Sequence, residues 1–348
     1  MASSTDVAKL AGVSIATVSR VINRHPQVDP KLVEVVQQAI ARLGYQPPET
    51  SRVGRPRKVP SGIRAGTMAL LFPDSDRTAI KTPLSAALIH GIEEALRERN
   101  LTLIVSGLND AGDLPPSIDS KMVDGVIVRG GTDQARLSTL LRGIPAVWMF
   151  ESGGVAPHDW DFVLDDNAMI GSMAAQYLLD CNCGSLALVN MMPRHPSFKA
   201  RIRAFADLLE QAGRPAVILS ENAEAAQLID RIMATRPAEP LGVFVPGSDS
   251  NVSAVYRALT ARGLALGRHF YLISCNNDPH RLETLNPALP NIDIQAEHIA
   301  RAAVELLLWR LRNPKDPPRR VIIAPKLVTN RDASLEALPA ASEAGQLP

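Results

Sequence analysis

Short apolar runs alternate with amphipathic helical segments through most of this 348-residue chain, from about Ala65 onward. The apolar runs, which predict strands, are 67–72, 101–106, 125–129, 146–150, 162–164, 186–190, 216–219, 242–245 and 270–274. The segments of helical period between them are 84–99, 134–141, 169–179, 198–212, 225–235, 252–262 and 297–312. Strands rich in Val, Ile and Leu that are separated by helices indicate parallel sheets covered on both faces. This number of strands fits either one barrel or two open sheets, and periodicity does not choose between them.

Composition excludes several other classes of protein. The chain is 46% apolar and 21% charged, which is typical of a folded protein, and its length predicts two or more domains. No uncharged apolar run is long enough to span a bilayer, and the first residues lack the pattern of a secretory signal. Three cysteines (Cys181, Cys183 and Cys275) are too few for a disulfide framework or a closed zinc site. We therefore expect a soluble, cytoplasmic protein without a membrane partner.

Charge is distributed unevenly along the chain. The formal net charge is +1, but residues 1–64 contain ten Lys or Arg and only four Asp or Glu. This segment therefore carries +6, and the rest of the chain carries −5. A small basic head on a larger acidic body suggests a nucleic-acid partner, although a solvated basic tail would give the same balance.

The basic head has the pattern of three short helices, expected at 5–12, 15–23 and 31–43. Thr5 and Ser14 are placed to cap the first two, and Gly12 and Gly44 follow the ends of the first and third. The apolar residues expected to face inward are Val7, Ala8, Ala11, Val18, Val21, Ile22, Val33, Val36, Ile40 and Leu43. Two short helices joined by a Gly-containing turn predict a helix-turn-helix.

The outer side of the second predicted helix carries residues suited to DNA. In a major groove, Ile15 and Ala16 would meet thymine methyl groups, and Arg20 would offer a bidentate fork to guanine. The short donors suited to phosphate oxygens are Thr17, Ser19 and Asn23. The remaining candidate DNA contacts of the head are Thr5, Ser14 and Tyr45. For any one of these residues, the alternative is a polar side chain that only solvates a surface helix.

The string TDVAKLAGVSIATVSRVIN, followed by Val28 and then ARLGYQP, is far more specific than any single residue. On these residues, the segment from Thr5 to Tyr45 resembles the DNA-binding head of the lactose/galactose repressor (LacI/GalR) family. The resemblance implies a three-helix, helix-turn-helix DNA-binding domain over residues 1–46.

Residues 47–65 depart from that family. The family has a hinge helix here, whose Leu wedges into the minor groove, but this chain has Pro48, Gly54, Pro56 and Pro60 and no Leu at the wedge position. The sequence GRPRK (54–58) resembles the core of an AT-hook instead. The candidate minor-groove contacts in this linker are Arg52, Arg55, Arg57 and Lys58. The alternative is a Pro-rich basic linker that touches only phosphates, or nothing.

Weaker matches to the same family continue through the body. The matching residues are DGVIV (124–128), Ile144, Pro145, Asp166, Asn167, Arg201, Phe205, Asp249, Gly263, Leu264 and Gln295. They imply an α/β fold class in which a periplasmic-binding-protein-like body has two α/β lobes with parallel sheets, joined by three crossovers. We expect an effector-binding and dimerisation domain over 66–332, with lobe one at about 66–161 and 293–322 and lobe two at about 162–290 and 323–332. Residues 333–348 are expected to be a disordered tail.

The resemblance also implies a ligand cleft between the lobes, at the carboxyl ends of the strands. The candidate effector-binding residues are Asp74, Arg129, Ser197, Arg201, Ser248, Asp249 and Asn276. Ser248 replaces a family Asn, and Asn276 replaces a family Asp, which removes a charge but keeps an oxygen acceptor. Arg201 aligns with an effector-contacting Arg of the family, although it could also be solvated or pair with an acid. Trp148 and Trp160 could stack on a sugar, but packing in a lobe core is the preferred interpretation.

No GxSxG, HExxH, Walker A or GxGxxG motif occurs, so we expect no enzyme, cofactor or metal site. Asp165 and Asp166 are adjacent carboxylates, but neighbours at a strand end point apart. The chain is expected to be a nucleoid-associated transcriptional regulator, most often a repressor in this family, that binds a pseudo-palindromic operator as a homodimer. A sugar-like effector would shift the lobes between two arrangements. The alternative is a ligand-independent DNA-binding regulator or architectural protein whose body serves only for dimerisation.

Overall fold

A computed structural model describes residues 3–22, 28–45, 62–73, 79–108, 112–130, 134–150, 160–247, 249–276 and 289–329. The chain divides into two compact units, Met1–Lys58 and Val59–Pro348. The predicted DNA-contacting residues of the linker, and Asn23, Asp74 and Ser248, lie outside the described residues.

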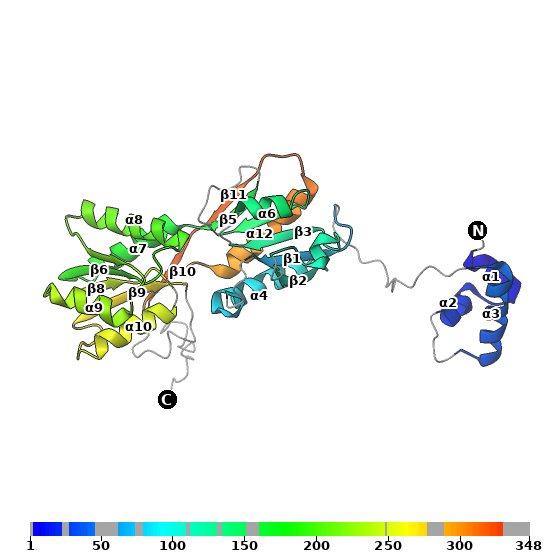
Figure 1. Ribbon diagram of the computed structural model, residues 1–348, viewed down its shortest axis with the longest axis horizontal. Coiled ribbons are helices and arrows are strands. Elements are labelled where there is room, and N and C mark those ends of the chain that lie inside the picture. The colour runs from blue at the N-terminus through cyan, green and yellow to red at the C-terminus, as the bar shows by residue number, and fades with distance from the viewer. Residues whose placement is uncertain are drawn as a thin grey trace, which may run out of the picture. The chain divides into compact units, whose positions relative to one another are not determined.

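Three helices form the first unit: α1 (Ser4–Ala11), α2 (Ile15–Ile22) and α3 (Pro30–Leu43) (Figure 1). Their apolar faces meet in one small core around Val7, Val18 and Val36, whose side chains are fully buried. Every residue predicted to face inward belongs to this core or packs against it. Gly12 and Gly44 adopt left-handed backbone conformations, with φ of 64° and 58°, and end α1 and α3. The predicted helix-turn-helix is therefore confirmed.

The cap of α1 differs from the prediction. Ser3, not Thr5, caps this helix, because its hydroxyl accepts from the backbone N–H of Asp6 at 3.3 Å. The Asp6 carboxylate accepts in turn from the Ser3 N–H at 2.9 Å, which completes a capping box and starts the helix one residue earlier than predicted. Ser14 caps α2 as predicted, and its hydroxyl accepts from the N–H of Thr17 at 3.1 Å.

Lobe one of the second unit is built on a parallel six-stranded sheet. Its strands, in spatial order, are β11 (Arg320–Ile323), β5 (Asp161–Asp165), β4 (Ala146–Met149), β3 (Gly125–Arg129), β1 (Thr67–Phe72) and β2 (Thr102–Gly107). The helical segments of this lobe are η1 (Ala79–Lys81), α4 (Pro83–Arg97), α5 (Pro116–Asp119), α6 (Gln134–Leu140) and α12 (Ala296–Arg312). Alternate residues of β1 face opposite cores: Met68 and Leu70 pack with α4 and α12, and Ala69 and Leu71 pack with α5 and α6.

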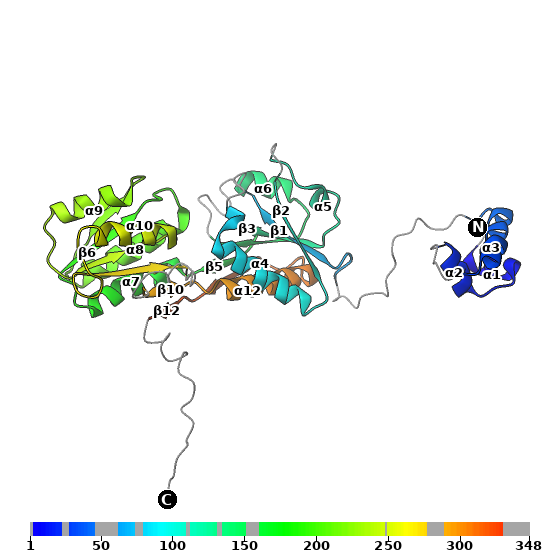
Figure 2. The same cartoon turned by 90° about the horizontal axis from the view of Figure 1, so that it is seen from below.

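Lobe two contains the second six-stranded sheet, which lies apart from the first in both views (Figures 1 and 2). Its strands, in spatial order, are β12 (Lys326–Val328), β10 (Asn291–Asp293), β9 (Phe270–Cys275), β8 (Leu241–Phe244), β6 (Ser185–Asn190) and β7 (Val217–Ser220). Its neighbours pair in parallel except β10 and β12, which are antiparallel. The helices that cover its two faces are α7 (Asn167–Asp180) with α8 (Pro196–Gln211), and α9 (Ala225–Ala234) with α10 (Asp249–Thr260). Two open sheets, rather than one barrel, are thus present.

The predicted lobe boundaries need three corrections. Residues 162–164 were expected in lobe two, but β5 pairs with β4 and β11, so the first crossover follows Asp165. Asp293 was expected in lobe one, but it ends β10 and belongs to the sheet of lobe two. Ile323 was expected in lobe two, but it ends β11 and pairs with Asp165 in the sheet of lobe one, so the third crossover joins Ile323 to Lys326. The strands β10, β11 and β12 were not predicted, because they are short and two of them begin with a charged residue.

Asp124 holds the beginning of the second unit. Its carboxylate accepts hydrogen bonds of 2.7–3.2 Å from the backbone N–H groups of four consecutive residues, 64–67. Ile63 enters the core of lobe one, and Gly62 lies against the end of α12, where an added Cβ would be 3.2 Å from the carbonyl oxygen of Leu311. The chain is therefore firmly attached to lobe one from Gly62 onward.

Among the described residues, no helix is both long and apolar enough to cross a membrane.

Candidate functional site

Helix α2 presents a polar and apolar outer face to solvent. Val18 and Val21 point into the small core, whereas Ile15, which is 51% exposed, lies on the outer side with Ala16, Ser19 and Arg20. Thr17 is half-buried, and its hydroxyl lies 2.9 Å from that of Ser14. The residues predicted to reach base edges are therefore accessible together on one helix face.

Two other predicted DNA contacts of the head lie off this helix. Thr5 is exposed on α1. Tyr45 directly follows the end of α3, where its half-buried ring packs against the core of the head. The ring of Tyr45 therefore packs in the head, and this packing does not depend on what its hydroxyl group contacts.

In lobe one, the carboxyl ends of the strands bring Arg129 and Asp165 to the same sheet edge. Arg129 is in register with Met149 on β4, and Met149 is in register with Val163 on β5. Two strand spacings of about 4.8 Å each therefore separate the backbone of Arg129 from that of β5. The Arg129 guanidinium carbon lies 6.0 Å from the ring centre of Phe72, at the end of β1.

In lobe two, Arg201 of α8 is buried and surrounded by protein groups. Its Nη2 donates to the Asp165 carboxylate at 2.8 Å, and its Nε donates to Oδ1 of Asn167 at 2.7 Å. Its Nη1 donates to the carbonyl oxygen of Pro246 at 2.9 Å and to Sγ of Cys275 at 3.0 Å. Burial acts to lower the pKa of Arg201, but the interactions with Cys275 and Asp165 outweigh burial and raise the pKa. The guanidinium is therefore a charged member of a buried network.

His195 lies at the start of α8, beside Arg201. Its ring stacks on Phe198, with ring centres 4.0 Å apart, and its buried Nδ1 has no hydrogen-bond partner among the described residues. Burial, and then the positive charges of Arg201 and Arg129, lower the pKa of His195 to about 4. His195 is thus a neutral imidazole whose buried Nδ1 could accept or donate a hydrogen bond, and we add it to the candidate effector-binding residues. Its neighbour in sequence, two positions on, is Ser197, which is also buried.

Asn276 follows β9 with a left-handed φ of 91°. Its backbone N–H donates to the carbonyl oxygen of Ile292 at 3.1 Å, and its buried Oδ1 has no partner among the described residues. Asp249 begins α10, which follows β8 in sequence. The carboxyl ends of both sheets thus meet around Arg201, with His195 and Asn276 next to them.

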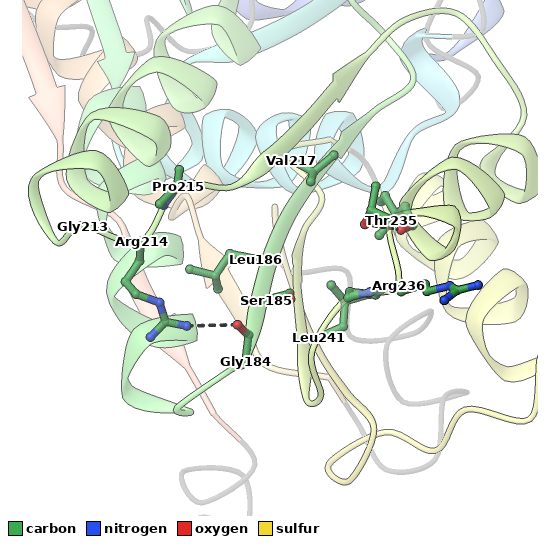
Figure 3. A pocket seen from close by; sticks show the side chains of 12 residues that line it. Gly184, Ser185, Leu186, Gly213, Arg214, Pro215, Val217, Thr235, Arg236 and Leu241 are labelled. Carbon is green, nitrogen blue, oxygen red and sulfur yellow. Dashed lines mark hydrogen bonds between the residues drawn. The ribbon is translucent and has the colours of Figure 1, made fainter.

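Two hollows lie at the opposite, amino ends of the strands. One, of about 320 Å³, is bounded by the starts of β6, β7 and β8, and Arg214 on its wall donates to the carbonyl oxygen of Gly184 at 3.4 Å (Figure 3). The other, of about 440 Å³, lies beside Trp160 and Asp161 at the starts of β4 and β5. Neither hollow is lined by a predicted effector-binding residue.

Comparison with known proteins places both parts of the chain. Residues 5–48 match the family of bacterial regulatory proteins called the lacI family, and residues 175–332 match the periplasmic binding protein-like domain. Together the two matches cover more than half of the 348 residues. The chain belongs to the LacI family.

Relatives of this LacI-family chain align along nearly its whole length. The ribose operon repressor of Haemophilus influenzae is 26% identical over 341 residues, which are 94% of this chain and 97% of the repressor. The complex of the transcriptional regulator CelR with cellobiose has a TM-score of 0.65 and 24% identity, and covers 94% of this chain and 99% of CelR. The lac repressor dimer bound to operator and the anti-inducer ONPF has a TM-score of 0.64 and 17% identity, and covers 94% of this chain and 98% of that repressor chain.

Several residues around the LacI-family site were not predicted. Asp165 and Asp166 do separate as expected, because Asp165 turns to Arg201 whereas Asp166 caps α7 by accepting from the Met169 N–H at 2.8 Å. The sequence is compatible with Arg201 either contacting a ligand or pairing with an acid, and it does not identify Asp165 as that acid. Trp148 is fully buried, in agreement with the preferred core interpretation. The participation of Cys275 and His195 had no signal in the sequence, since neither lies in a motif.

Proposed function

We propose that this LacI-family chain is a sequence-specific DNA-binding transcriptional regulator, and not an enzyme, that acts in the cytoplasm on the nucleoid. The observation that carries the proposal is the division of α2, with Val18 and Val21 buried and Ile15, Ala16 and Arg20 exposed. A helix that reads bases in the major groove needs this division, because its inner face must pack on the other helices of the head.

A homodimer on a pseudo-palindromic operator is the assembly that we propose. A three-helix head reaches few base pairs, so two-fold symmetry would supply a second half-site. Among the described residues, β2 is an edge strand that pairs with β1 alone, and its Val105 is 37% exposed. The similar fold of the lac repressor, whose structure is a dimer on operator DNA, supports this assembly.

The proposed effector is a small sugar-like molecule that binds between the lobes, at the carboxyl ends of the two sheets. Ser197, His195 and Asn276 supply neutral hydrogen-bonding groups there, and two of them have a buried polar atom without a partner among the described residues. The cellobiose complex of CelR, which has a similar fold, supports a sugar. We also propose Asp74, Arg129, Ser248 and Asp249 for this site, as the family resemblance implies.

Selection of bound fragments from the source genome, followed by affinity measurements on the selected sites, tests DNA recognition. Arg20→Gln is expected to weaken binding to the selected site by about 1–3 kcal/mol and to relax preference at one base pair. Arg42→Gln, which removes an exposed Arg of α3, is the matched control and should leave base preference unchanged. Equal preference in the Arg20 variant would contradict the proposed orientation of α2.

Thermal unfolding with candidate sugars, beginning with D-ribose and cellobiose, tests the effector. A ligand at about 100 times its Kd should add about 2.7 kcal/mol to the unfolding free energy. A sugar that stabilises the protein should also change its affinity for the selected DNA. Stabilisation without any change in DNA affinity would favour the alternative, in which the body serves only for dimerisation.

A further inference from the structure

The backbone at Arg201 is fixed by the close approach of α7 and α8. Gly171 of α7 faces Arg201, and a Cβ added at Gly171 would overlap the Arg201 carbonyl oxygen and lie 3.0 Å from the backbone nitrogen of Phe205. The two helices therefore lie closer together than any larger residue at 171 would allow. The packing of α7 on α8 thus fixes the backbone of Arg201 independently of its side-chain contacts.

The Arg201 side chain is also fixed, by hydrogen bonds to four other residues. A guanidinium has five N–H groups, and four of them are used by Asp165, Asn167, Pro246 and Cys275. Both members of the Arg201–Asp165 ion pair are almost fully buried, with 3% and 1% of their side chains exposed. A ligand that took the planar fork of Arg201 would have to leave the Asp165 carboxylate buried without its counter-charge, which is strongly unfavourable.

Asp165 connects this network to the other lobe. It is the last residue of β5, in the sheet of lobe one, whereas Arg201, Pro246 and Cys275 belong to lobe two. Asn167, the first residue of α7, donates to the Asp165 carboxylate at 3.1 Å, so the network encloses the whole first crossover. Gln295 joins the other two crossovers, because its side-chain amide donates to the carbonyl oxygen of Ala324 at 2.5 Å.

We propose that Asp165 withdraws Arg201 from ligand recognition and uses it to fix the first crossover, so that Arg201 is a positioning residue of the hinge. The Arg201 guanidinium, which the family resemblance assigned to effector binding, then stabilises the connection between the lobes. Asp165 determines specificity, because it withdraws Arg201, the one positive charge among the candidate effector residues of lobe two. A ligand then meets the neutral groups of His195, Ser197 and Asn276, together with the proposed Asp249. This last consequence depends on the proposed function. The role of the Arg201–Asp165 ion pair in fixing the first crossover, which we call the latch, does not.

Distances between the lobes in the ligand-free, full-length protein test the latch. In a Cys181→Ser background, spin labels at Met122→Cys in lobe one and Glu210→Cys in lobe two report the distance distribution by double electron–electron resonance. Both positions are exposed. Asp165→Ala is expected to broaden the distribution at least twofold, and 100 mM formate, which replaces the lost carboxylate, should narrow it again. Formate should leave the unsubstituted protein unchanged, because its Arg201 is already engaged.

The matched controls are Arg203→Gln and Asp207→Asn, which break an exposed ion pair on the same helix, α8. Both should leave the distribution unchanged. An unchanged distribution in Asp165→Ala, or the same response to formate with and without Asp165, would overturn the latch. If Asp165→Ala does not fold, the double variant Asp165→Ala with Arg201→Met should recover folding, and failure to recover would equally overturn it. No DNA or effector is needed, so these outcomes do not depend on the proposed function.

Discussion

At the scale of single residues, Asp124 shows how one carboxylate can organise a segment. Asp124→Asn would keep one oxygen acceptor but turn an NH₂ group toward backbone N–H donors. We expect a loss of about 2–4 kcal/mol in unfolding free energy, because hydrogen bonds to a buried charged group are replaced by a donor–donor contact. Urea unfolding measures the loss, and hydrogen exchange should show faster exchange at 64–67. Asp119→Asn, at an exposed position, is the control, and equal losses in the two variants would contradict this role.

His195 makes a second prediction at this scale, on the effect of pH. Its folded pKa of about 4 is below the value near 6.5 of an unfolded His, so between these values only the unfolded chain binds the proton. The stability that His195 contributes is therefore complete above pH 6.5 and decreases as the pH falls toward 4. We expect it to account for about 2 kcal/mol of the loss between pH 7.5 and pH 5.

Urea unfolding at these two pH values, with His195→Gln beside the parent, measures that contribution. The substitution should remove most of this difference, whereas His90→Gln, at an exposed position of α4, should not. An identical pH dependence in His195→Gln and the parent would show that His195 titrates normally in the folded protein.

The contacts of individual site residues were harder to predict from the sequence than the faces of helices. Ile15, Ala16 and Arg20 could be placed on the outer face of α2, because helical spacing and the buried Val18 and Val21 determine it locally. The contacts of Arg201 depend instead on residues 36 and 74 positions away in sequence. No local pattern carries that information, so the choice between ligand contact and ion pair needed the fold.

At the scale of helices and strands, the sequence predicts strand bounds correctly where the strand is almost completely buried. The bounds of β1 and β3 agree with the prediction, because both are continuous apolar runs between turn residues. The strands β11 and β12 lie at sheet edges and begin with exposed Arg320 and Lys326, so only a short apolar run is left in each to detect. Edge strands of this kind are recognised by their partners, not by their own residues.

The packing of α7 on α8 makes a prediction at the scale of these elements. Gly171→Ala would place a methyl group into the Arg201 carbonyl oxygen, so the helices would have to separate. We expect a loss of about 3 kcal/mol in unfolding free energy, together with a broader distance distribution between the lobes. Gln176→Ala, at an exposed position of the same helix, is the control. A loss below about 1 kcal/mol would mean that α7 can move without disturbing Arg201.

At the scale of the whole molecule, the family resemblance supplied what periodicity could not. Alternating strands and helices allowed one barrel or two sheets, and the two sheets observed agree with the resemblance. The crossovers lie a few residues away from their predicted positions, because strand pairing across the sheets determines them and local sequence does not. The boundaries of the head and linker remain predictions.

The linker between the two units is the subject of the whole-molecule prediction. Arg55→Gln with Arg57→Gln should reduce affinity for selected sites with an A·T-rich centre by about tenfold, since a narrow minor groove attracts Arg. Affinity for sites with a G·C-rich centre should decrease less. Lys31→Gln with Arg42→Gln removes the same charge from α3 and is the control. Equal decreases for both kinds of site would show that the linker contacts only phosphates.

The three crossovers also determine the order in which the parts of this chain can be completed during synthesis. Helix α12, whose Arg301 pairs with Glu94 and Glu98 of α4, and strand β11, which closes one edge of the lobe-one sheet, both follow almost all of lobe two in sequence. The first unit needs only its own three helices, and lobe two is nearly continuous from Asn167 to Asp293. Lobe one begins before lobe two on the ribosome, but it can finish only after all of lobe two except β12 has been synthesised. A nascent chain thus has its DNA-reading helices folded well before the lobe that follows them in sequence is complete.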